Sequence, residues 1–190
     1  MNFDRIEDEE FNKIDFTSQK LPGFEFENCT FDNCNFSEMN LSGFTFLECV
    51  FIGCDLTNAQ LNDTSLKDID FKDCKLLGLQ FSNCNELLLS FRFTNCQMNL
   101  ISFHKLKIKS TQFIGCNLTE ADFSEADISN SSFTNCDLTR TIFEFTNLEE
   151  VNFSSALNFT IDPENNKLKK AKFSKENVIG LLEKYNIEIE

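Results

Sequence analysis

Large apolar side chains recur at every fifth position along most of the chain. Phe or Leu occupies each such position from Phe11 to Phe81, and after a break the series resumes at Leu88 and runs to Phe153. A period of five fits neither the roughly 3.6-residue turn of an α-helix nor the two-residue alternation of a flat strand. It predicts a chain that turns a corner every five residues.

The cysteines indicate how many of these segments make one coil. Six of them lie in the same phrase, as in FDNCNF, FIGCDL and FTNCDL, and are spaced by 20, 20, 22, 20 and 20 residues. They are Cys34, Cys54, Cys74, Cys96, Cys116 and Cys136. The spacing of 22 falls where the five-residue series slips by two, within residues 82–92. The repeat therefore predicts nearly eight coils of 20 residues, each made of four pentapeptides.

The same pattern predicts which side chains face inward. The large apolar residue and the small residue two positions before it point into the coil, and the other positions, mostly Asn, Ser, Thr, Asp and Glu, face water. Coils that pair as strands do lie ~4.8 Å apart, which gives a rod roughly 38 Å long. Each coil buries its apolar residues only against its neighbours, so no coil is stable alone.

The segments CDLTNAQL, CNLTEADFSEADIS and CDLTRTIF resemble the A(D/N)LXX repeat of the pentapeptide repeat proteins. The resemblance covers residues 11–158. It implies an all-β fold, the right-handed quadrilateral β-helix. Residues 1–10 are then expected to cap the first coil, because an open strand edge invites aggregation.

Two segments depart from the repeat. Within the slip, Leu88 is in the core by register, so its neighbours Leu87 and Leu89 are expected to face outward or to fill a bulge. Residues 159–190 form a different element: Ser174 is a good N-cap, and an α-helix is predicted over about residues 175–185. Its apolar residues are Val178, Leu181, Leu182 and Tyr185. They are expected to cover the open end of the coil, to pack on a second copy, or to do both.

Composition and charge exclude several classes of protein. The chain has 31 acidic and 17 basic side chains and a formal charge of −14, so a direct interaction with nucleic acid is not expected. No apolar run approaches the ~18 residues of a membrane span. The first ten residues are acidic where a signal peptide is basic and then apolar, and a cytoplasmic location is therefore expected.

Cysteine and histidine do not indicate catalysis. All nine cysteines occupy the small inward slot, and we interpret them as small buried side chains in a reducing compartment, not as metal ligands or disulfides. The single histidine, His104, faces outward and has no second histidine to support a nucleophile. Carboxylates on a rod without a cleft lack the pocket that separates catalytic pKa values. We expect no enzyme, no cofactor and no metal.

Charge is distributed in blocks. Residues 1–63 have 13 acidic and 3 basic side chains, residues 64–118 have 4 and 7, and residues 119–164 have 10 and 1. One face of the predicted coil, which includes Phe26 and Phe46, collects acidic residues from both ends of the chain. They are Glu25, Glu27, Glu48, Asp68, Asp127, Glu149 and Glu150. This surface either imitates the phosphates of DNA or only keeps the rod soluble.

The ending LLEKYNIEIE resembles that of the Qnr-type members of the family. This resemblance implies a homodimer formed through the C-terminal helix and a DNA mimic that binds bacterial DNA gyrase and topoisomerase IV and protects them from fluoroquinolones. The acidic face is then the partner surface, with Glu86, Leu87 and Leu89 of the insertion as a second contact. The short insertion and the basic residues Lys105, Lys107 and Lys109 depart from that pattern. The alternative is a rigid scaffold that binds an unrelated protein through its weakly charged face.

Overall fold

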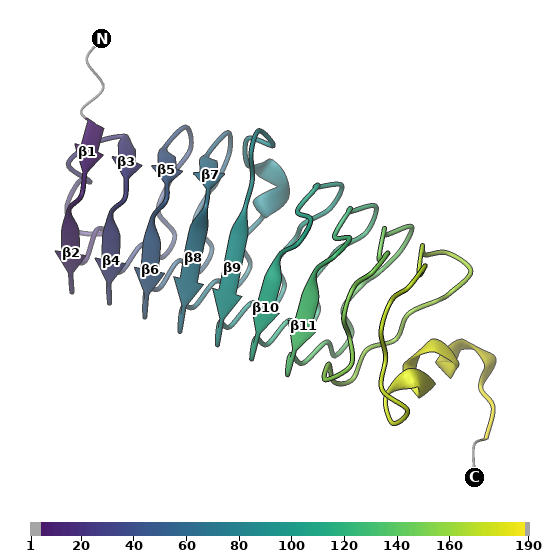
Figure 1. Ribbon diagram of the computed structural model, residues 1–190. Helices are drawn as coiled ribbons and strands as arrows, with labels where there is room; N and C mark the ends of the chain where they lie inside the picture. Colours follow the sequence, from purple (N-terminus) through teal and green to yellow (C-terminus); the bar gives the residue numbers. More distant parts are fainter. Residues whose placement is uncertain (1–4, 189–190) are drawn as a thin grey trace.

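The chain folds as a β-solenoid, and the computed structural model describes residues 5–188 (Figure 1). Short parallel strands stack coil upon coil into two sheets, in the order β1-β3-β5-β7 and β11-β10-β9-β8-β6-β4-β2. The strands are β1 (Arg5–Glu7), β2 (Glu10–Asn12), β3 (Glu25–Glu27), β4 (Thr30–Asp32), β5 (Thr45–Leu47), β6 (Val50–Ile52), β7 (Ser65–Lys67), β8 (Ile69–Lys72), β9 (Phe91–Thr94), β10 (Gln112–Ile114) and β11 (Ser132–Thr134). The predicted β-helix is confirmed. Of the cap expected over residues 1–10, residues 1–4 lie outside the described residues.

The register of the strands follows the spacing of the cysteines. Phe31 pairs with Phe51, twenty residues on, and Phe71 pairs with Phe93 across the slip, twenty-two residues on. Both spacings are as predicted. The stack also continues past residue 158, since Asn152 pairs with Lys172.

Most corners of the coil have a residue with a left-handed backbone. These residues lie two positions after a core residue and are mostly Asn, Asp, Glu or Gly, which tolerate a positive φ or, for Asn, Asp and Gly, favour it. At many corners an Asp or Asn one position before the core residue accepts the N–H of the residue two places on, as Asp137 does from Thr139 at 3.0 Å. This hydrogen bond explains the D/N of the repeat.

The core is built around an unbroken column of phenylalanine rings from Phe11 to Phe173. Successive rings along this column are nearly parallel, with centroids 4.8 to 5.4 Å apart. Rings from adjacent faces meet this column edge-on, as Phe123 meets Phe133 at 89°. Stacked and edge-to-face pairs are the arrangements that aromatic rings prefer, so one residue type can repeat along the whole length of this column.

The slot two positions before a core residue often holds Cys or Thr, small side chains that can donate a hydrogen bond, while other slots hold Ala, Ile or Leu. All nine cysteines are buried and free, as predicted, and Cys54 Sγ donates to the carbonyl of Phe31 in the preceding coil at 3.2 Å. Threonine fills the same slot with the same bond: Thr64 Oγ1 donates to the carbonyl of Leu41 at 2.8 Å. The donor satisfies a carbonyl of the neighbouring turn.

The interpretation of the insertion was wrong in its register. Leu88, expected in the core, is 61% exposed and has a φ of 63°, whereas Leu89, expected to contact a partner, is buried. The reason is an Asx turn at Asn85. The Asn85 side-chain Oδ1 accepts the Leu87 N–H at 3.0 Å, and this turn places Leu88 at a corner. The insertion follows η1 (Phe81–Asn83), a short 3₁₀ helix.

The α-helix predicted over residues 175–185 is also wrong. The segment forms two short 3₁₀ helices, η2 (Val178–Leu181) and η3 (Glu183–Tyr185). Tertiary contacts override the helical spacing: Asn177 Nδ2 donates to the Phe153 carbonyl at 2.7 Å, and the Ile161 N–H donates to the Gly180 carbonyl at 3.0 Å. The tail is thus tied to the last coil at two points and closes the end of the stack.

Candidate protein-interaction surface

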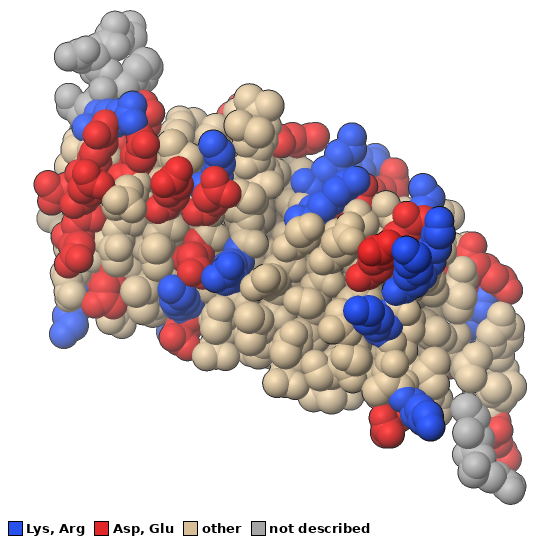
Figure 2. All heavy atoms as spheres, viewed as in Figure 1, with Lys and Arg blue, Asp and Glu red and all other residues tan. Residues whose placement is uncertain are grey.

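The acidic residues of the predicted face lie in two groups. In the first group, Glu25 and Glu27 flank Phe26 on β3, while Glu48 and Asp68 follow β5 and β7 at corners with φ values of 53° and 54°. Figure 2 shows acidic side chains gathered over the first coils. We call Glu25, Glu27, Glu48 and Asp68 the N-terminal acidic group.

Few cations neutralise this first group. Arg5 contacts both Glu25, at 3.9 Å, and Glu27, and its side chain is 46% exposed. Exposed ion pairs of this kind contribute ~0–1 kcal/mol. Among residues 5–188, neither Glu48 nor Asp68 has a cationic group within the 4.0 Å of an ion pair. These carboxylates are free to meet basic groups of a partner.

In the second group, Asp127, Glu149 and Glu150, two of the three carboxylates already lie in ion pairs. Lys109 Nζ lies 3.0 Å from Asp127, and Lys170 Nζ lies 3.2 Å from Glu150. Asp127 also accepts the Ser129 N–H and the Asn147 side chain, which makes it part of the turn. Partial burial works to raise the pKa of Asp127, but the bonds from Lys109 and Ser129 outweigh it and lower that pKa. The face predicted from sequence is therefore not uniform.

The insertion separates the two groups. The four-stranded sheet ends at β7, and pairing on this face resumes only where Lys107 pairs with Asp127. Within the described chain, residues 86–89 make no backbone–backbone hydrogen bond with another coil. Glu86 is exposed and Leu87 is 70% exposed. The residues available to a partner here are therefore Glu86, Leu87 and Leu88.

The C-terminal segment covers the last coil with one side only. Leu181 packs against the core, and a Cβ on Gly180 would lie 2.3 Å from the Phe159 carbonyl oxygen, so only glycine allows this approach. The other side leaves apolar residues exposed. They are Val178, Ile179, Tyr185 and Ile187. One of them, Ile179, was missed by the sequence reasoning because it assigned a helical face.

Ion pairs fix this segment in place. Lys184 Nζ lies 2.6 Å from Asp162 and 2.9 Å from Glu164, and Tyr185 Oη donates to Glu164 at 3.1 Å. The hydrogen bonds to Asp162 and Glu164 raise the pKa of Lys184. The cap is held by contacts between residues about 20 positions apart, as the coils are.

The hydroxyl nearest the single histidine, His104, is held by a carboxylate. His104 Nδ1 lies 2.9 Å from Ser124 Oγ. That hydroxyl donates its hydrogen bond to Asp122 at 2.6 Å, so it does not donate to His104 as a nucleophile would to its general base. Over residues 5–188, His, Cys, Asp and Glu form no group of three or more arranged to hold a metal ion. In the same range no helix has the length and apolar character needed to cross a membrane.

Comparison with known families places the chain. The model described as pentapeptide repeat region matches residues 44–113 and 106–181, and the model described as pentapeptide repeats (8 copies) matches residues 10–46. The chain belongs to the pentapeptide repeat family. No curated protein sequence matches it.

Several solved structures are similar over most of their length. A trypsin-treated form of QnrB1, described as a plasmid-mediated fluoroquinolone resistance protein, has 21% identity and a TM-score of 0.49, with 98% of this chain and 97% of that chain covered. Full-length QnrB1 has 21% identity and a TM-score of 0.41 over 96% and 100%. HetL, a pentapeptide repeat protein from the cyanobacterium Nostoc sp. strain PCC 7120, has 18% identity and a TM-score of 0.29 over 90% and 86%.

Proposed function

We propose that this protein is a DNA mimic that binds bacterial type II topoisomerases, DNA gyrase or topoisomerase IV. The observation that carries the proposal is the charge density of its N-terminal coils. Residues 1–63, about three coils, have 13 acidic and 3 basic side chains. At ~4.8 Å per coil this is roughly one net charge per 1.5 Å of rod, close to the ~1.7 Å per charge of duplex DNA.

The mechanism is competition for the basic residues that bind DNA. Carboxylates of the N-terminal acidic group pair with Arg and Lys on the enzyme, and the rigid stack holds them at the spacing of the coils. By occupying that surface, the protein protects the enzyme from fluoroquinolones. Exposed carboxylates are screened by salt, so the affinity falls as the ionic strength rises.

We also propose that the protein acts as a homodimer joined at its C-terminal ends. The exposed residues Val178, Ile179, Tyr185 and Ile187 form the contact, and a hollow of about 190 Å³ lined in part by Ile179, Leu182 and Ile187 receives side chains of the second copy. A twofold axis there makes the contact self-complementary. It leaves both acidic N-terminal ends free at the two tips of a longer rod.

The test is a DNA gyrase supercoiling assay, with and without ciprofloxacin, at a low and a high salt concentration. The proposal requires that the purified protein inhibits supercoiling or rescues it from the drug, and that the effect weakens at high salt. No effect at micromolar protein on either gyrase or topoisomerase IV would refute it.

A scaffold function is the second candidate, and one observation favours it. From β10 onward the outward residues of the seven-stranded sheet carry no charge: Gln112, Ile114, Ser132 and Thr134. A flat neutral surface of this kind binds a protein partner by shape and apolar contact. Binding that persists at high salt supports this candidate over the first.

A further inference from the structure

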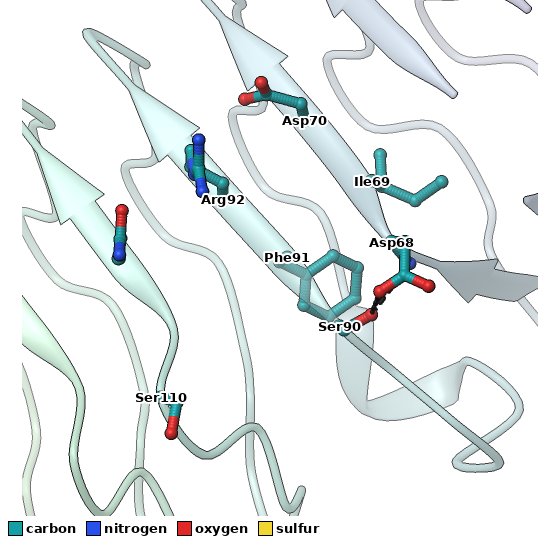
Figure 3. A pocket seen from close by; sticks show the side chains of 8 residues that line it. Asp68, Ile69, Asp70, Ser90, Phe91, Arg92 and Ser110 are labelled. Carbon is teal, nitrogen blue, oxygen red and sulfur yellow. Dashed lines mark hydrogen bonds between the residues drawn. The ribbon is translucent and has the colours of Figure 1, made fainter. Parts of the chain in front are cut away.

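The insertion opens a pocket beside the N-terminal acidic group, and its volume is about 250 Å³. Its residues come from three successive coils: Asp68, Ile69, Asp70, Ser90, Phe91, Arg92, Ser110 and Gln112. In Figure 3 the Phe91 ring lies next to Asp68, and the Arg92 side chain lies farther along the same strand, β9. The pocket exists because residues 86–89 leave the ladder, so the corner at Asp68 has no regular neighbour in the next coil. Its size suits one long side chain and not a nucleotide.

The two carboxylates of the pocket have unused acceptor capacity. Asp70 Oδ2 lies 3.0 Å from Lys72 Nζ, but Asp70 Oδ1 is buried and has no hydrogen-bond partner in the described chain. Asp68 Oδ1 accepts the Ser90 hydroxyl at 2.6 Å, and Ser90 Oγ in turn accepts the Asp68 N–H at 2.7 Å. Ser90 thus fixes Asp68 and leaves Oδ2 available. A buried acceptor without a donor is costly, so a turn of the Asp70 carboxylate that brings Oδ1 to a ligand in the pocket removes the cost.

Arg92 is the internal competitor for these carboxylates. It lies directly opposite Asp70 in the ladder between β8 and β9, yet among the described residues no ion pair joins the two. Its guanidinium is exposed at the wall of the pocket (Figure 3). A second cation that enters the pocket therefore meets Asp68 Oδ2, an Asp70 carboxylate that must turn to offer Oδ1, and one repelling charge.

We propose that this pocket receives an arginine side chain of the partner protein. A guanidinium offers planar N–H groups that can reach Asp68 and Asp70 together, and its flat face suits the Phe91 side chain that lines the pocket. Lysine, a point charge without a flat face, uses only one of these features. The proposal rests on the proposed function for its partner, a basic DNA-binding surface, but not for the chemistry of the pocket.

The pocket is tested first without any partner, by NMR titration of the protein with N-acetyl-L-arginine amide. Saturable shifts are expected at the amides of Ser90, Phe91 and Gln112, with a dissociation constant in the millimolar range. Asp70→Asn should weaken binding at least about fivefold, and Arg92→Gln should strengthen it. The matched control is Asp63→Asn, which removes one exposed charge at another corner. Shifts that do not saturate, or that persist unchanged in Asp70→Asn, overturn the proposal.

The same variants are then measured for binding to intact DNA gyrase. A weaker Asp70→Asn and a tighter Arg92→Gln, with Asp63→Asn close to the parent, support the pocket as an arginine site. If gyrase binds Asp70→Asn and Asp63→Asn equally well and the arginine amide does not bind, the pocket fails and the proposed function stands. If the amide binds but gyrase does not, the pocket stands and the topoisomerase is not the partner.

Discussion

At the scale of single residues, the fold depends on two inward positions per pentapeptide. The core position takes one large apolar side chain, and the slot two places earlier often takes Cys or Thr, which can donate to a carbonyl of the coil before. Both positions were predictable, because each recurs every five residues along the sequence. The donor role was not predictable, since a sulfur or hydroxyl hydrogen bond to a backbone carbonyl leaves no periodic signal beyond smallness.

Removing one ring from the aromatic column should strongly lower the free energy of unfolding. Phe113 is fully buried and stacks between Phe93 and Phe133, so Phe113→Ala is expected to lower the free energy of unfolding by about 3–5 kcal/mol. Phe145 is 70% exposed at a corner, and Phe145→Ala should change that free energy by less than about 0.5 kcal/mol. Urea unfolding followed by circular dichroism measures both. Equal losses would mean that the column does not carry the stability.

The Asp residues of the turns should make stability depend on acid. Partial burial works to raise the pKa of Asp137, but hydrogen bonds from Thr139 and Asn158 outweigh it and hold that pKa below its usual value. A depressed pKa adds stability above the unfolded pKa of ~3.9, and this is lost as the pH falls through the lower folded value. Asn at this position keeps the turn, as Asn117 does with Thr119. The stability difference between wild type and Asp137→Asn should therefore shrink from pH 5 to pH 3 in urea titrations; a constant difference would contradict this linkage.

At the scale of elements, sequence reasoning succeeded where the repeat is regular and failed where it is interrupted. The strands, the spacing of 20 and the slip of two follow from counting core residues. Counting cannot decide which leucine of an insertion faces out, because the Asx turn at Asn85 competes with the register. Helical spacing in the tail was equally misleading, since the contacts of Asn177 and Gly180 with the last coil decide its conformation.

A substitution at the Leu88 corner should stabilise the protein. A left-handed backbone costs a bulky residue about 1 kcal/mol or more, and most other corners use Asn, Asp, Glu or Gly. Leu88→Asn is expected to raise the free energy of unfolding by up to about 1 kcal/mol. The opposite change is Gly115→Ala, where φ is 64° and the new Cβ would lie 2.5 Å from Asn95 Oδ1. It should destabilise the protein. A destabilised Leu88→Asn would indicate that the leucine packs on something in solution.

Two substitutions in the C-terminal segment should separate an effect on association from an effect on folding. Ile179 is 48% exposed, so Ile179→Asp should give monomers in light scattering without lowering the melting temperature. Leu181 packs on the core, and Leu181→Asp should lower the melting temperature as well. A wild-type monomer at all concentrations, or a dimer that survives Ile179→Asp, would contradict the proposed interface.

At the scale of the whole molecule, the two ends of the rod differ in how much of their negative charge is paired with cations. Its N-terminal coils carry carboxylates with few cations nearby, whereas Lys109 and Lys170 pair with Asp127 and Glu150 further along the same face. Residues 119–164 are nearly as acidic by count as the first coils, so the sequence placed acidic residues of both ends on one face, interrupted by Lys105, Lys107 and Lys109. The difference lies in which bases the coiling brings alongside, and block-wise charge along the chain does not contain that information.

This polarity predicts that charge removal matters at one end only. The triple change Glu25→Gln, Glu48→Gln and Asp68→Asn should weaken binding to DNA gyrase about tenfold or more, and it should flatten the dependence of affinity on salt. The matched triple change Glu125→Gln, Glu149→Gln and Glu150→Gln removes the same charge from coils with lysines nearby. It should weaken binding by less than about threefold, since part of that charge is already compensated.

The two sets of variants distinguish three mechanisms, because they have the same net charge. If only the N-terminal set weakens binding, specific carboxylates contact the enzyme and the mimicry is local. If both sets weaken it equally, only the overall charge of the rod attracts the partner, and the assignment of the N-terminal acidic group is wrong. If neither set has an effect on a complex that forms, the neutral face of β10 and β11 is the better candidate, and binding should then persist at high salt.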